Sequence, residues 1–164
     1  MRHLIIMLCC FILSSCGVRP LNDFDKHNNL LTQIELGNVS GEKTYLVKNQ
    51  LINTLNPYNE DNKKLYIIDV TINSTNSNSI VQKDSTILEK TTNINLTYTL
   101  RKQGSSKELT KGNFVTKSSF FNTVSPYGSF VQENKAFEEA LKLSITNLKR
   151  KLLIFFAKSQ QNKK

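Results

Sequence analysis

Hydrophobic and polar residues alternate along four stretches of the chain, which is the pattern of β-strands with one buried and one hydrated face. The alternation is clearest in residues 85–102, where apolar side chains take every second position from 94 to 100 and asparagine or threonine stands between them. Three shorter stretches share this character, and one of them, residues 65–74, is rich in β-branched residues. The predicted strands are residues 30–39, 65–74, 85–102 and 107–122.

Glycine- and serine-rich segments separate the predicted strands. Gly37 and Gly41 bracket a turn after the first strand, and the segment STNSNS (residues 74–79) is expected to be a hydrated loop. Gly104 opens a short turn that would fold the last two strands into a hairpin. Gly112 would mark a β-bulge in the returning strand.

Two further stretches have a helical period. Residues 42–56 place Tyr45, Ile52 and Leu55 on one predicted face with Leu51 beside them, and the proline that follows ends this helix. A longer helix is predicted within residues 125–158, where a capping box would start the first turn and basic residues gather in the second half. The capping box pairs Ser129 with Gln132, and the buried face carries Phe137, Leu141, Ser144, Leu148, Leu152 and Phe155, flanked by Ala136, Ala140, Ile145 and Phe156.

The order β-α-β-β-β-α predicts an α+β fold, a two-layer α/β sandwich. A four-stranded, mostly antiparallel sheet with two helices on one face would bury the apolar positions and leave the other sheet face in water. Residues 30–158 would form this single domain, and residues 159–164 would form a polar tail.

The first fifteen residues differ from the predicted domain. A short basic start, an apolar run from Leu4 to Leu13 and two serines before Cys16 are typical of a secretory signal peptide. The sequence Leu-Ser-Ser-Cys also resembles the bacterial lipobox, in which the cysteine sulfur receives a diacylglyceryl group and becomes the new N-terminus. Residues 1–15 are therefore predicted to be removed, leaving Cys16 as a lipid anchor and residues 16–29 as a tether. In the alternative, the protein is secreted without a lipid and Cys16 is incidental.

The cysteine count supports the lipid anchor. Cys9 and Cys10 leave with the signal segment, so the mature chain keeps one cysteine and no disulfide framework can form. Acylation would cap this single thiol in an oxidising compartment. Gly17, where aspartate would be a retention signal by analogy with the enterobacterial sorting rule, predicts a lipid-anchored protein on the periplasmic face of the outer membrane.

Charge narrows the range of partners. The chain has a formal net charge of +9, which becomes +8 when Arg2 leaves with the signal segment. Lipid headgroups and lipopolysaccharide (LPS) phosphates are the polyanions of the envelope, whereas nucleic acid is a poor partner for an exported protein.

No set of catalytic or metal-ligating residues stands out. His27 is the one histidine of the mature chain, which leaves too few ligands for a zinc site. The sequence has no nucleophile elbow and no phosphate-binding glycine loop. The adjacent carboxylates Glu60-Asp61 and Glu138-Glu139 are interpreted as solvated surface. Hydrolase and transferase activities are therefore disfavoured, and we expect neither a metal nor a cofactor.

Basic residues on both sides of the predicted hairpin turn would gather at one end of the sheet. They are Arg101 and Lys102 on the first strand and Lys107 and Lys111 on the second. Arginine can hold a phosphate through two hydrogen bonds, and neighbouring lysines add positive charge, so we hypothesise a contact with the phosphates of lipid A. In the alternative, these charges only protect the hairpin from edge-to-edge aggregation.

Three stretches carry a family resemblance when they are read with the order of the elements. The first is the start of the mature chain, the second is the end of the last strand with the short connection after it, and the third is the closing helix. They contain Cys16, Gly17, Arg19, Pro20 and Leu21; Ser119, Phe120, Asn122 and Tyr127; and Ala136, Ala140, Leu148 and Leu152. Together they resemble the LPS-assembly lipoprotein (LptE) family in its alphaproteobacterial form.

The resemblance implies a protein without enzymatic activity, seated inside the periplasmic end of the outer-membrane β-barrel LptD. Members of this family plug the barrel lumen, assist its assembly and contact LPS on its way to the outer leaflet. A sheet face rich in threonine, asparagine and serine would suit a polar lumen. The main alternative is an accessory lipoprotein of another envelope transport complex, and an envelope hydrolase is a third interpretation.

Overall fold

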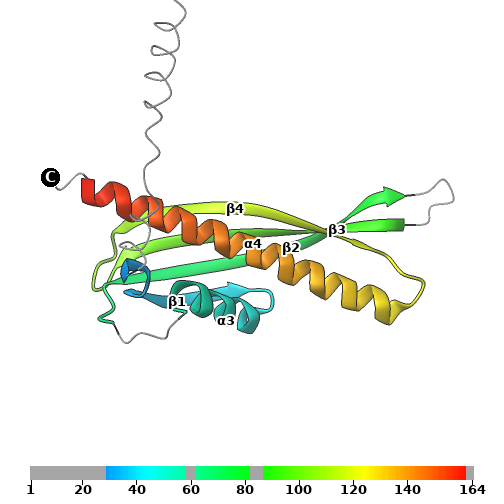
Figure 1. The fold of residues 1–164 in the computed structure, drawn as a ribbon, viewed down its shortest axis with the longest axis horizontal. Helices are drawn as coiled ribbons and strands as arrows, with labels where there is room; N and C mark the ends of the chain where they lie inside the picture. The colour runs from blue at the N-terminus through cyan, green and yellow to red at the C-terminus, as the bar shows by residue number, and fades with distance from the viewer. Residues whose placement is uncertain (1–28, 58–61, 82–86, 162–164) are drawn as a thin grey trace, which may run out of the picture.

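The computed structural model describes residues 29–57, 62–81 and 87–161. The predictions for the signal segment, for Cys16 and for the tether as far as residue 28 lie outside these ranges. The elements follow the predicted order (Figure 1): β1 Ile34–Gly41, α3 Thr44–Leu55, β2 Tyr66–Val81, β3 Ile87–Lys102, β4 Glu108–Phe121 and α4 Pro126–Gln161. At about 1.5 Å per residue, the 36 residues of α4 make a helix about 54 Å long.

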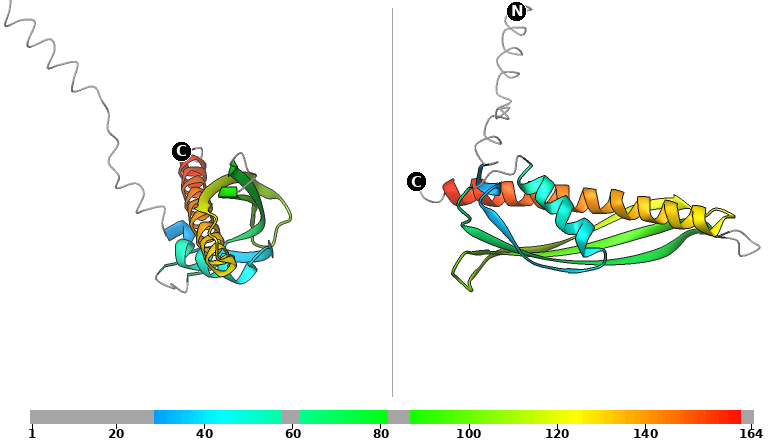
Figure 2. Two further views of the ribbon diagram at one scale, coloured as in Figure 1. Left: turned by 90° about the vertical axis from the view of Figure 1, so that its right-hand side faces the viewer. Right: turned by 90° about the horizontal axis from the view of Figure 1, so that it is seen from below.

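The four strands form one sheet in the order β1-β2-β3-β4. β1 runs parallel to β2, whereas β2, β3 and β4 pair antiparallel. In the described part of the chain, α3 and α4 lie over the same face of this twisted sheet and its other face is left open (Figures 1 and 2). The predicted α+β two-layer sandwich is confirmed.

The core lies between the sheet and the helices. The predicted buried face of α4 is confirmed, except that Phe155 is half-buried at its edge. Alternate residues of the strands meet this face, as the period of two requires. The core side chains of the sheet are Ile34, Val39, Ile68, Val70, Ile72, Ile94, Leu96, Tyr98 and Leu100, and those of α4 include Phe137, Leu141, Ile145, Leu148, Leu152 and Phe156.

The predicted core face of α3 is wrong by part of a turn. Val47, Leu51 and Leu55 are buried, whereas Tyr45 is 67% exposed and Ile52 is 46% exposed. Lys43 adopts a left-handed conformation with φ 46° immediately before the helix. Its side chain reaches α4, where its Nζ donates to Asn134 Oδ1 at 2.6 Å and lies 4.3 Å from the centre of the Phe137 ring.

The predicted loop at residues 74–79 is wrong, because β2 continues through it to Val81. The segment pairs with β3 as far as the Val81–Ile87 register. Its short polar side chains bond across the strands, as where Thr92 Oγ1 donates to Asn76 Oδ1 at 2.8 Å. The serine and asparagine side chains here form hydrogen bonds across a solvent-exposed strand pair, although this composition is typical of loops.

The glycines in the strands also have different roles from those predicted. Gly112 is not a bulge, because it pairs in regular register with Tyr98, and a Cβ there would lie 3.1 Å from the tyrosine ring. Gly37 does not begin a turn, because β1 continues to Gly41. The register of β1 instead shifts between Leu36 and Val39.

The start of α4 is not the predicted capping box. The helix begins at Pro126, and Ser125 Oγ accepts a hydrogen bond from the backbone N–H of Gly128 at 3.3 Å. Ser129 Oγ instead bonds the backbone of Thr123, which fixes the connection from β4. Proline has no backbone N–H. A helix that starts at Pro126, before the predicted start at Ser129, therefore has one N–H fewer that needs a capping partner.

One polar contact crosses the core between α4 and the sheet. Thr116 Oγ1 donates to the carbonyl oxygen of Ala140 at 2.9 Å and lies 2.5 Å from Ser144 Oγ. Both side chains are buried, with exposures of 5% and 0%. This pair explains a serine on an otherwise apolar helix face, because it fixes the position of α4 along β4.

The two hydroxyls of this pair should contribute to stability together, so that removing both costs less than the sum of the two single losses. We expect Thr116→Val to lower the free energy of unfolding by about 1–3 kcal/mol, because Ser144 Oγ loses a buried partner. Ser144→Ala removes the complementary group, so the double variant should be clearly more stable than the sum of the single effects predicts. Urea denaturation of the four proteins measures this coupling, and strict additivity would contradict it.

Candidate anion-binding end of the sheet

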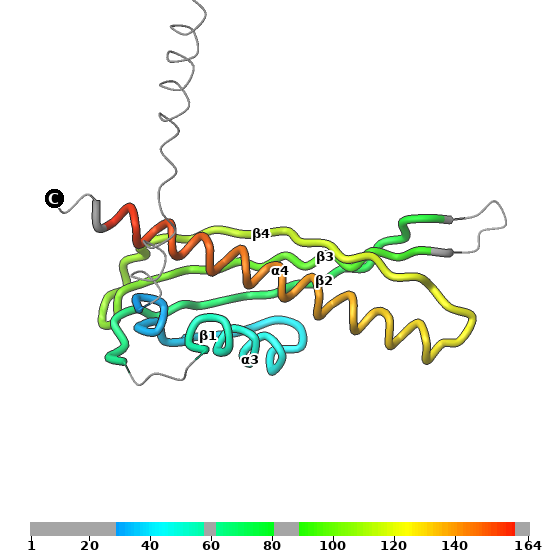
Figure 3. The backbone as a smooth tube through the Cα atoms, in the orientation of Figure 1, coloured from blue at the N-terminus to red at the C-terminus, as the bar shows by residue number. Residues whose placement is uncertain are grey.

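The four basic residues predicted as a site lie around the turn between β3 and β4. Arg101 and Lys102 end β3, Lys107 precedes β4 and Lys111 lies within it. The turn is held by the Ser105 N–H, which donates to the Lys102 carbonyl at 3.1 Å, and by Gly104 with φ 75°. The hairpin therefore brings all four residues to one end of the sheet, the same end of the domain at which α4 terminates (Figure 3).

Two of these cations already have a carboxylate partner. Arg101 Nε lies 3.2 Å from Asp69 Oδ2, and Lys111 Nζ lies 3.1 Å from Glu108 Oε2. Lys102 and Lys107 are exposed and have no carboxylate partner among the described residues. They are the cations of the group that can meet an external anion without first breaking an ion pair.

Asp69 is a residue of this end that the sequence analysis did not identify. Its Oδ2 bonds Arg101, and its Oδ1 accepts a hydrogen bond from the backbone N–H of Asn38 at 2.7 Å. The carboxylate therefore links β3, β2 and the irregular part of β1, which gives Arg101 a structural role. The sequence did contain a signal for this residue, because Asp69 is a lone carboxylate within an otherwise apolar stretch of β2.

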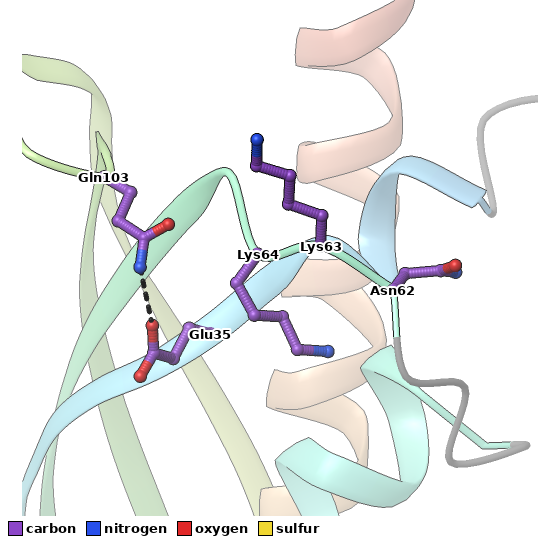
Figure 4. Close-up of a pocket in the computed structure, with 5 residues that line it drawn as sticks. All are labelled: Glu35, Asn62, Lys63, Lys64 and Gln103. Atoms are coloured by element: carbon purple, nitrogen blue, oxygen red, sulfur yellow. Dashed lines mark hydrogen bonds between the residues drawn. The ribbon is translucent and has the colours of Figure 1, made fainter.

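An open depression lies next to the turn (Figure 4). It encloses about 610 Å³ and is lined by Glu35, Asn62, Lys63, Lys64 and Gln103. Gln103 Nε2 donates to Glu35 Oε2 at 3.5 Å, and Lys64 Nζ donates to the carbonyl oxygen of Thr32 at 2.7 Å. Figure 4 shows the Lys63 side chain extending away from the other lining residues. The depression therefore places two further lysines, Lys63 and Lys64, next to the four basic residues around the turn.

The open face of the sheet is polar, as the alternation predicted. Its neighbouring side chains bond one another, as where the hydroxyls of Ser40 and Thr71 lie 3.0 Å apart. Val115 is an apolar exception in this face, with 59% exposure. Other outward-facing residues of the three antiparallel strands are Asn73, Asn95, Thr97, Thr99, Asn113 and Lys117.

No described helix is both long and apolar enough to span a membrane. The described residues also contain no group of three or more histidine, cysteine or carboxylate side chains that could hold a metal ion.

Comparison with solved structures identifies proteins of the same architecture. A lipoprotein of Caulobacter crescentus matches with a TM-score of 0.67 and 17% identity, over 82% of this chain and 97% of that one. This chain shares the fold of the Caulobacter protein and of the two proteins that follow. The minor lipoprotein of Acinetobacter baumannii matches with a TM-score of 0.55 and 12% identity, over 74% and 90% of the two chains. Rare lipoprotein B of Shewanella oneidensis matches with a TM-score of 0.53 and 11% identity, over 79% and 96%.

Comparisons by sequence add no closer relative. No family model matches the chain, and no curated protein matches it by sequence. At identities of 11–17%, the structural likeness establishes the architecture, and the site residues are assigned from their own geometry.

The contact between Asp69 and β1 makes a prediction about Gly37. A Cβ at this position would lie 2.2 Å from Asp69 Oδ1, so Gly37→Ala would displace the carboxylate from the Asn38 N–H. We expect a loss of about 1–3 kcal/mol in the free energy of unfolding, because a charge-assisted hydrogen bond is lost. Thermal denaturation measures the change, and the same substitution in an Asp69→Ala background should have a smaller effect. An equal loss in both backgrounds would contradict this role of Asp69.

Proposed function

We propose that the protein is an outer-membrane lipoprotein that plugs the LptD β-barrel, helps the barrel assemble and assists LPS insertion into the outer leaflet. The observation that carries the proposal is the fold likeness to lipoproteins over nearly their full length. The lipobox before Cys16 supports the lipid anchor, and the resemblance to the LptE family supplies the partner.

The shape and surface of the domain suit a plug. The open sheet face consists mainly of hydroxyl and amide side chains, which can exchange hydrogen bonds with the polar wall of a barrel lumen. The long helix runs the length of the domain and packs against β3 and β4, which stiffens the structure along its long axis (Figure 1). At about 54 Å, that axis exceeds the roughly 30 Å hydrocarbon thickness of a bilayer.

Contact with LPS would use the four basic residues around the turn between β3 and β4. Lys102 and Lys107 would meet the phosphates of lipid A first, because both are exposed and free of carboxylate partners among the described residues. Arg101 and Lys111 would add charge, and Arg101 would bind a phosphate fully only by leaving Asp69. The alternative role, protection of the hairpin from aggregation, needs the charges but no ligand.

Recovery of a barrel with the tagged, lipidated protein tests the partner. The complex is captured from detergent-solubilised outer membrane, and the proteins that co-purify are identified by mass spectrometry. We expect a large β-barrel in near-equal amount, whereas recovery of a different transport complex would support the alternative accessory role.

The contact face is tested by Val115→Arg, which places a long charged side chain on the open sheet face. We expect it to reduce barrel recovery strongly, because the polar face would no longer fit the lumen. Leu143→Arg is the matched control, since Leu143 is also exposed, at 49%, but lies on α4. Equal recovery with both variants would contradict contact through the sheet.

The LPS contact is tested with Lys102→Glu/Lys107→Glu. We expect affinity for detergent-dispersed LPS to fall on the order of tenfold or more, because two attractive charges become repulsive. Lys117→Glu/Lys135→Glu makes the same change in charge elsewhere and should have a much smaller effect. Unchanged binding by the first variant, or by Arg101→Glu, would leave the aggregation-protection role as the explanation.

A further inference from the structure

Positive charge is concentrated at one end of the long axis. We define the basic end as residues 62–69, 101–111 and 149–158 together with Glu35. It holds ten cations and three carboxylates, whereas the rest of the described chain holds six lysines and five glutamates. The cations of the basic end are Lys63, Lys64, Arg101, Lys102, Lys107, Lys111, Lys149, Arg150, Lys151 and Lys158.

These cations surround the end of the domain and do not converge on one point. They come from the residues before β2, from the turn between β3 and β4, and from the last turns of α4. Lys107, Lys151 and Lys158 are exposed, and none of the three has a carboxylate partner in the described ranges. A single phosphate needs donors that converge, whereas separated cations match a flat surface that carries many negative charges.

The chain enters the fold at this same end. Leu31 is buried there, and Thr32 accepts a hydrogen bond from Asn62 Nδ2 at 2.7 Å through its hydroxyl. Figures 1 and 2 show this first described segment beside the C-terminal end of α4. Twelve residues separate Cys16 from Asn29, so the thirteen steps between their Cα atoms span at most about 47 Å when fully extended. This reach is shorter than the roughly 54 Å length of α4, so an anchor at Cys16 would favour orientations with the basic end on the membrane side.

We propose that the basic end docks on the anionic phospholipid surface of the membrane that holds the anchor. This inference rests on the proposed lipid anchor but needs no barrel. The acyl chains and the basic end act as two signals, one hydrophobic and one electrostatic, and together they orient the domain with its long axis pointing away from the bilayer.

Energy transfer from the turn to the membrane measures docking of the mature, lipidated protein. A donor dye is attached at Ser106→Cys in the turn, and the acceptor is a lipid dye in vesicles that contain no LPS. We expect strong transfer with phosphatidylglycerol-containing vesicles, a loss of transfer as salt rises, and weak transfer with phosphatidylcholine vesicles. A donor at Asn78→Cys, near the far end of β2, should show weak transfer with both.

Charge variants separate docking from the proposed LPS contact. Lys63→Gln/Lys151→Gln/Lys158→Gln leaves the four residues near the turn intact, and we expect it to undock at a several-fold lower salt concentration. Lys117→Gln/Lys135→Gln/Lys142→Gln removes the same charge outside the basic end and should behave like the parent protein. Equal sensitivity of the two variants would overturn the proposal.

The remaining outcomes also decide the question. Equal transfer with both kinds of vesicle would overturn docking, and transfer that requires added LPS would assign the basic end to lipid A. Failure to recover a barrel leaves this assay unaffected, because it contains no protein partner. If mass spectrometry finds Cys16 without acyl chains, the proposed anchor fails, and salt-sensitive co-sedimentation of the chain with phosphatidylglycerol vesicles then tests the basic end alone.

Discussion

The packing of α4 along the sheet is the contact on which the rest of the structure depends. A sheet with one apolar face cannot remain folded without a cover, and this helix provides it along β3 and β4. Leucine and isoleucine supply the burial, but apolar packing alone would tolerate a helix shifted by a turn. The Thr116–Ser144 contact opposes such a shift, because moving the helix would leave two hydroxyls buried without partners. The same contact fixes where the basic residues of the last turns of α4 lie, because a shifted helix would move them away from the basic end.

The fold was predictable where a side-chain period extends over many residues. β3 and α4 were identified in this way because burial on one face repeats over many residues, from Thr92 to Leu100 in β3 and from Ala136 to Phe156 in α4. The extension of β2 through residues 74–79 was not, because a hydrated strand has no buried face to mark its period. The buried face of α3 was also misassigned, because apolar residues occur on more than one side of this short helix and the structure buries Val47 rather than Tyr45 or Ile52. The hairpin made it predictable that Arg101 and Lys107 lie at the same end of the sheet. The ion pair between Arg101 and Asp69 was not predictable, because it depends on the register between β2 and β3.

Topology explains why positive charge gathers at one end of the described domain. The antiparallel strands β3 and β4 turn there, β2 begins there, and α4 ends there after running the length of the domain (Figure 1). Lysines near the C-terminus of a helix are favoured by its dipole, and lysines at a hairpin turn discourage edge pairing. Each group therefore has a local reason to be basic. Their coincidence at the end where the chain enters the fold is not required by either reason, and it supports a shared surface function.

The polar sheet face and the basic end lie mostly on different parts of the domain, so the proposed barrel plugging and the proposed membrane docking would not compete. A domain held in a barrel by its open face would leave the end near the tether directed toward the anchored leaflet. Phospholipid headgroups at that leaflet would then balance the charge that the lumen does not contact. In a free lipoprotein, the same docking would hold the domain upright and present its far end to a barrel. Orientation before capture would reduce the rotational freedom lost on binding, because an anchored and oriented partner has less freedom left to lose.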